Sequence, residues 1–102
     1  MGLCIALQSE SGEQIDWIAD ERNLLGKLID SPDEVEFPML ASIDRYGDTT
    51  FNRLQIERFL AEWGTLFAKA TTLEETALLQ TVKALGEASR LHVHQYLVFI
   101  GD

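Results

Sequence analysis

Two histidines near the carboxyl end are the side chains in this sequence best suited to hold a metal ion. His92 and His94 are two positions apart, so on a β-strand their rings would lie on the same face and could share one ion. Two imidazoles leave a metal site incomplete, and Asp102 or an acid from another element would have to complete it. The structural alternative is that one histidine ends a helix and the other begins a strand.

Covalent and calcium-dependent chemistry have little support. The single cysteine, Cys4, lies in an apolar segment without a neighbouring cation, which predicts a buried and inert thiol. A calcium loop starting at Asp44 fails, because Tyr46, Thr49 and Gln55 occupy its third, sixth and twelfth positions. The sequence also has no phosphate-binding loop and no nucleophile elbow. These features favour a protein that is not an enzyme and has no cofactor.

Acidic side chains are concentrated in one quarter of the chain. Residues 10–36 hold nine of its 17 acids and two of its eight bases, and so carry −7 of the net charge of −9. This asymmetry disfavours nucleic acid and anionic membranes and would steer a basic protein towards the segment. The nine acids are Glu10, Glu13, Asp16, Asp20, Glu21, Asp30, Asp33, Glu34 and Glu36.

A small, acidic chain without catalytic motifs resembles the immunity proteins of bacterial toxin systems. The closing segment, His94-Gln95-Tyr96-Leu97-Val98-Phe99-Ile100-Gly101-Asp102, and the Tyr46-Gly47-Asp48-Thr49 turn also resemble small uncharacterised bacterial proteins. The immunity resemblance implies an acidic protein-binding module whose carboxylates replace phosphate on a basic partner. Its contact residues would be Asp30, Asp33, Glu34 and Glu36, with Asp20, Glu21, Glu10, Glu13 and Asp16 as a secondary face.

Three other hypotheses stay open at this stage. The acids could form a solvated surface that serves solubility. The chain could be a structural homodimer or an assembly subunit, because a strand that is apolar on both faces favours a partner over the second face of its sheet. The third hypothesis is a metal-binding protein built around the two histidines.

Length and composition predict one globular domain over residues 1–102, with 46% hydrophobic and 25% charged residues. A lone cysteine suits a reducing compartment, and residues 1–7 lack the basic start of a signal peptide. No apolar run approaches the roughly 18 residues needed to span a bilayer. The sequence therefore predicts a soluble, cytoplasmic protein without a membrane partner.

The first half of the chain predicts a hairpin followed by a short helix. Leu3, Ile5 and Leu7 alternate with smaller residues, residues 9–13 suit a turn, and residues 14–18 return as a second strand. Asp20 or Asn23 can cap a helix that ends at Ser31-Pro32. Residues 37–43 are expected to be extended, and residues 44–48 to form a turn with Gly47 at positive φ.

The second half predicts two helices and a central strand. Apolar residues recur at helical spacing between Ile56 and Ala70, and Thr72 with Glu75 forms a capping-box pattern that opens another helix. Residues 93–100 are expected to form a central strand, since residues 96–100 are apolar on both faces. The fold class is therefore α+β, with a small, mainly antiparallel sheet packed against about three helices.

Aromatic residues are divided between the expected core and a turn. Trp17, Trp63, Phe59 and Phe67 are interpreted as core. Tyr46 and Phe51 flank the turn, where they either cover the end of the core or serve as partly exposed anchors for a partner.

Overall fold

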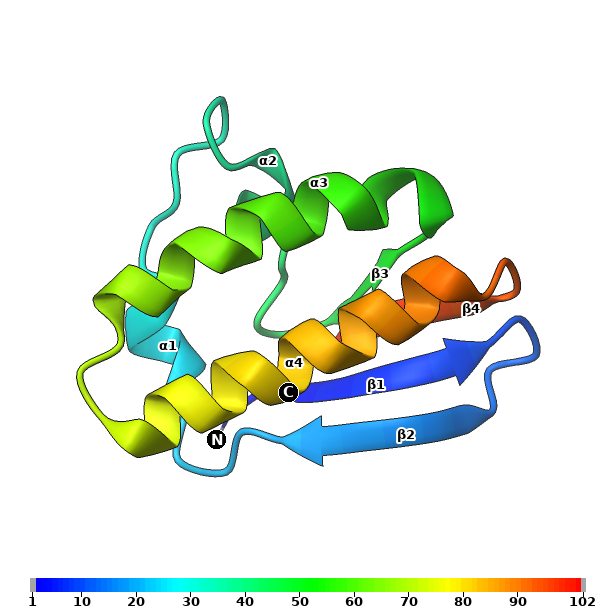
Figure 1. Ribbon diagram of the computed structural model, residues 1–102, viewed down its shortest axis with the longest axis horizontal. Helices are drawn as coiled ribbons and strands as arrows, with labels where there is room; N and C mark the ends of the chain where they lie inside the picture. Colours follow the sequence, from blue (N-terminus) through cyan, green and yellow to red (C-terminus); the bar gives the residue numbers. More distant parts are fainter. Residues whose placement is uncertain (1, 102) are drawn as a thin grey trace.

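A four-stranded antiparallel sheet joins the two ends of the chain in the computed structural model, which describes residues 2–101 (Figure 1). Its strands are β1 (Cys4–Ser9), β2 (Gln14–Ala19), β3 (Asp48–Phe51) and β4 (Gln95–Ile100), in the spatial order β2-β1-β4-β3. Helices pack against this sheet, so the predicted α+β class is confirmed.

The amino-terminal hairpin forms where the alternating sequence predicts it. In its turn, Gly12 has φ +88°, a left-handed conformation that glycine adopts without steric cost. The pairing shifts by one residue between Leu7 and Gln8, which leaves Ile15 as an extra residue in β2. Gly47, in contrast, is not among the residues with positive φ, so that prediction is wrong.

The carboxyl-terminal strand lies inside the sheet, as its apolar sequence predicts. β4 pairs with β1 on one side and with β3 on the other. Its Leu97 and Phe99 side chains enter the core beneath the helices. The β3 strand was not predicted, because its four residues carry little apolar signal of their own.

Five helical segments connect and cover the strands. They are α1 (Leu25–Leu28), α2 (Pro38–Ala41), α3 (Arg53–Gly64), the 3₁₀-helix η1 (Thr65–Lys69) and α4 (Leu73–Leu91). The helix expected up to Ala70 therefore continues beyond Gly64 only as the 3₁₀-helix. The extended conformation expected for residues 37–43 is also wrong, because α2 begins at Pro38, a residue whose fixed φ suits the first helical turn. Within residues 2–101, no helix combines the length and the apolar character that crossing a bilayer requires.

Aromatic rings fill the space between the sheet and α3. Phe59 lies 4.8 Å from Phe51 and 5.3 Å from Trp63, measured between ring centroids. Phe99 of β4 contacts all three rings at 5.7–5.9 Å. Phe51 is thus buried, whereas Tyr46 is exposed. Trp17 is 57% exposed, so its placement in the core was wrong.

The capping box of α4 forms as predicted and makes stability depend on pH. The Glu75 carboxylate accepts backbone N–H bonds from Thr71 at 2.8 Å and Thr72 at 3.1 Å, and Thr72 Oγ1 accepts from the Glu75 N–H. The Thr71 amide is the main cause that lowers the pKa of Glu75 below its ordinary value of 4.5, against the opposing effect of desolvation. These bonds therefore stabilise the folded state while Glu75 is ionised.

We expect the free energy of unfolding of Glu75→Gln to fall less steeply than that of the wild type as the pH is lowered. Because the folded-state pKa is the lower one, the stabilisation is present above the unfolded value of 4.5 and is lost as the pH falls through the folded value. Urea midpoints measured from about pH 7 down to about pH 3 would test this. Equal slopes for the wild type and Glu75→Gln would contradict it.

Candidate binding surface: the acidic loop

The acidic loop, residues 30–36, connects α1 to α2 and is folded by its own side chains. Asp33 Oδ1 accepts N–H bonds from Val35 at 2.8 Å and Glu36 at 3.0 Å, and the Phe37 N–H donates to the Asp33 carbonyl at 2.7 Å. The Glu36 amide, followed by that of Val35, lowers the pKa of the Asp33 carboxyl below 3.8. The loop is therefore a defined turn with an ionised carboxylate inside it.

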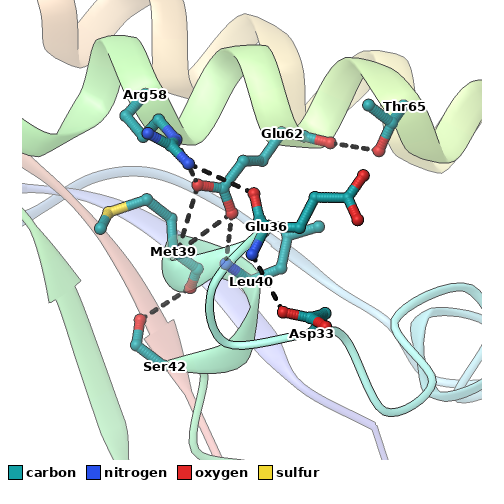
Figure 2. Close-up of polar contacts among 8 residues, drawn as sticks. All are labelled: Asp33, Glu36, Met39, Leu40, Ser42, Arg58, Glu62 and Thr65. Atoms are coloured by element: carbon teal, nitrogen blue, oxygen red, sulfur yellow. Dashed lines mark hydrogen bonds and ion pairs between the residues drawn. The ribbon is translucent and has the colours of Figure 1, made fainter.

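A buried carboxylate on α3 holds the far end of this loop (Figure 2). Glu62 is 4% exposed, and its Oε1 accepts N–H bonds from Met39 and Leu40, both at 3.0 Å, at the start of α2. Arg58, one helical turn earlier, pairs with Glu62 at 2.9 Å and donates to the Glu36 carbonyl at 3.2 Å. The loop is thus fastened to α3 at two consecutive points.

The four loop carboxylates are exposed, and of these Asp33 also bonds the loop backbone. Asp30, Asp33, Glu34 and Glu36 are all exposed, and none of them takes part in the ion pairs found within residues 2–101. Two cations beside the loop are directed to backbone carbonyls instead. Arg45 donates to the Gly26 and Ile29 carbonyls, and Lys69 to that of Leu28.

An exposed apolar side chain and two hollows accompany these charges. Val35 is 89% exposed and lies in the sequence between Glu34 and Glu36. Cavities of about 500 Å³ and 160 Å³ share the wall formed by residues 30–32. Arg45 and Tyr46 line the larger cavity, and Phe37 and Lys69 line the smaller. Such a surface offers shape as well as charge to a partner.

The other predicted acids do not join this loop in one patch. Asp20 is buried, where its carboxylate accepts N–H bonds from Leu24 and Leu25, each at 2.8 Å, and so supports the start of α1. The N-cap position itself is Leu24, so neither Asp20 nor Asn23 occupies it as predicted. Glu21 is exposed and lines a different hollow of about 290 Å³ together with Arg22 and Glu74. Glu10 and Glu13 lie in the hairpin turn, at the end of the sheet away from α1 (Figure 1).

The two histidines do not share a strand, as a common metal site would require, and the alternative that one of them ends a helix is correct for His92. His92 caps the end of α4, and β4 begins only at Gln95. His94 Nδ1 is bonded to Glu10 Oε1 at 2.6 Å, and both side chains are largely exposed. No cluster of three potential metal ligands occurs among residues 2–101. Asp102, the suggested completing ligand, lies outside the described residues.

Glu62 and Arg58 are the positioning residues that sequence reasoning missed. Charged side chains are mostly exposed, so residue type alone gives no reason to place either of them beside the core. Their spacing did carry a signal. Glu62 follows Phe59 by three residues and precedes Leu66 by four, which places it at the margin of the apolar face, and Arg58 is at the i−4 position suited to pair with it.

Cys4 has the properties expected of an unreactive thiol. It lies on β1 and is partly buried, and burial raises its pKa above the ordinary value.

Comparison with known proteins gave no relative: no family model matches the chain, and neither the curated proteins nor the solved structures contain a match.

Proposed function

We propose that this protein is an acidic protein-binding module of the immunity type, which docks a basic protein through the acidic loop. The observation that carries the proposal is the set of four exposed carboxylates that make no ion pair within the described chain. Cations are available close by, yet they bind carbonyl oxygens and Glu62. The carboxylates are therefore available to the cations of a partner.

Rigidity strengthens this assignment over a surface that serves solubility alone. A solubilising segment needs charge but no fixed shape, whereas preorganisation lowers the entropy that a binding surface loses on association. Here Asp33 bonds two loop amides, Arg58 holds the Glu36 carbonyl, and Glu62 holds the next turn. Val35 adds an apolar contact at the centre of the charges.

Neutralising the free carboxylates tests the proposal. We expect Asp30→Asn with Glu34→Gln to weaken capture of a basic partner from a lysate of the source organism by about tenfold or more at low salt. Neither side chain holds the loop together, so the variant should melt like the wild type. Asp33 is left unchanged because its carboxylate bonds the loop backbone.

The matched control removes the same charge elsewhere. Glu57→Gln with Glu87→Gln changes two exposed acids on α3 and α4 and should bind almost as well as the wild type. Elution in rising salt should release the partner, since exposed charges are screened within about 8–10 Å near physiological ionic strength. Equal losses in the two double variants would show that only net charge matters and would refute the loop as the contact site.

A further inference from the structure

The sheet has one face without a helix. Because Ile5, Leu7, Leu97 and Phe99 face the core, the alternate positions face the other way. Strand register places them in rows across the sheet, one of which joins Trp17, Ala6, Val98 and Thr50. This helix-free face consists of Cys4, Ala6, Gln8, Gln14, Trp17, Ala19, Asp48, Thr50, Tyr96, Val98 and Ile100. The bulge residue Ile15, two positions before Trp17, adds to it by strand alternation.

The helix-free face is almost uncharged in a strongly acidic chain, and it exposes two large apolar side chains. Trp17 is 57% exposed and Ile15 is 49% exposed, whereas Ala6 on β1 and Val98 on β4, the two central strands, are buried. Asp48 is its one charged member, although the chain carries a net charge of −9. Exposed apolar surface of this kind marks an interaction site, and depletion of charge is typical of an interface core.

We propose that this face is the interface of a homodimer with two-fold symmetry. Two copies with a net charge of −9 each repel one another, so stable self-association requires contact through a surface that lacks charge. The helix-free face meets this condition and, for the same reason, offers nothing to a basic partner. Charge therefore selects a second copy here and a basic protein at the acidic loop.

The large and small side chains of the helix-free face are placed so that the face can pack against the same face of a second copy. The indole of Trp17 stands on the outer strand β2, beside the small side chains of Cys4, Ala6 and Ala19. In a two-fold arrangement, each indole can pack on the partly exposed Cys4 and Ala19 of the other copy, because such an interface uses the same patch twice. Packed sheets lie about 10 Å apart, a separation that large side chains fill.

Face-to-face contact is favoured over edge-to-edge pairing. β2 has a bulge at Ile15 and an exposed Asp16, while β3 has only four residues, and both features protect a sheet edge. Three strands of six residues and one of four form an area of roughly 350 Å² per copy, which is small for a specific interface. We therefore expect a reversible dimer that forms at micromolar or higher concentration.

Light scattering after size-exclusion chromatography tests the dimer. The mass should rise from 11.5 kDa towards twice that value as the concentration increases from about 5 to about 500 μM. Trp17→Glu should hold the mass at the monomer value across this range. Leu73→Glu is the matched control, because Leu73 is 90% exposed at the start of α4, away from the face, and should dimerise like the wild type.

A second variant separates loss of dimer from loss of fold. Thr50→Glu changes an exposed residue in the same row as Trp17 and should also give a folded monomer, as judged by its circular dichroism. A wild-type mass of 11.5 kDa at every concentration would overturn the proposal. Dimerisation that survives both glutamate variants would assign the contact to another surface and overturn it equally. Either result leaves the acidic loop proposal standing, since the two surfaces share no residue.

Discussion

Replacing Glu62 by alanine should destabilise the protein by about 3 kcal/mol or more. The side chain is 4% exposed, and its carboxylate accepts bonds from Met39, Leu40 and Arg58. Alanine leaves the two buried amides and the guanidinium without their acceptor, and water cannot easily replace it. Truncating one partner of such an arrangement is costlier than the net strength of the arrangement suggests, because the remaining groups stay desolvated.

Urea denaturation of Glu62→Ala, Glu62→Gln and Glu57→Ala would measure this effect. Glutamine keeps one acceptor oxygen and should lose less stability than alanine. Glu57 is exposed on the same helix, so Glu57→Ala should change the free energy of unfolding by no more than about 0.5 kcal/mol. A loss below about 1 kcal/mol for Glu62→Ala would show that Glu62 does not hold the loop and α2 in place.

Replacing Trp63 by alanine should cost about 3–5 kcal/mol. The ring is completely buried, stacks with Phe59 at 5.3 Å and lies 5.8 Å from Phe99. Its Nε1–H donates to the Leu79 carbonyl at 3.1 Å, which ties α3 to α4. Alanine leaves a large cavity between these helices and removes the bond to Leu79, and Trp63→Phe should lose mainly the hydrogen bond.

Trp17 supplies an internal control of the same residue type. At 57% exposure, Trp17→Ala should cost the monomer less than about 1 kcal/mol. The two variants should also differ in fluorescence. Trp17→Ala keeps only the buried Trp63 and should emit at a shorter wavelength than Trp63→Ala, which keeps only Trp17. Equal losses of stability in Trp17→Ala and Trp63→Ala, measured at low concentration in urea, would contradict the assignment of one indole to the core and one to the surface.

Local signals account for the elements that the sequence predicts correctly. The hairpin follows from alternation and from Gly12, and α4 follows from the capping box at Thr72. Long-range contacts account for most of the elements it misses. The short helix α2 depends on Glu62, more than twenty residues away in the chain. The strand β3 is stabilised by its pairing with β4, and no local pattern in residues 48–51 predicts that pairing.

The difference between local signals and long-range contacts also explains which surface features the sequence predicts. Composition identifies the acids of residues 10–36, but the fold divides them between the hairpin turn, strand β2 with Asp16, the segment before α1 with the buried Asp20 and the exposed Glu21, and the acidic loop. Hydrophobicity places Trp17 in the core, whereas strand register turns it towards the helix-free face. Register depends on which residue of β1 meets which residue of β2, and the bulge at Ile15 alters it.

Photo-crosslinking from the centre of the acidic loop would test the central claim most directly. A photoreactive amino acid in place of Val35, which is 89% exposed, should capture one basic protein in a lysate of the source organism. The same probe in place of Leu54, which is 85% exposed at the amino end of α3, should not capture it. A crosslink from position 35 alone would establish the loop as the docking site. Identical products from both positions, or none from position 35, would contradict the proposed function.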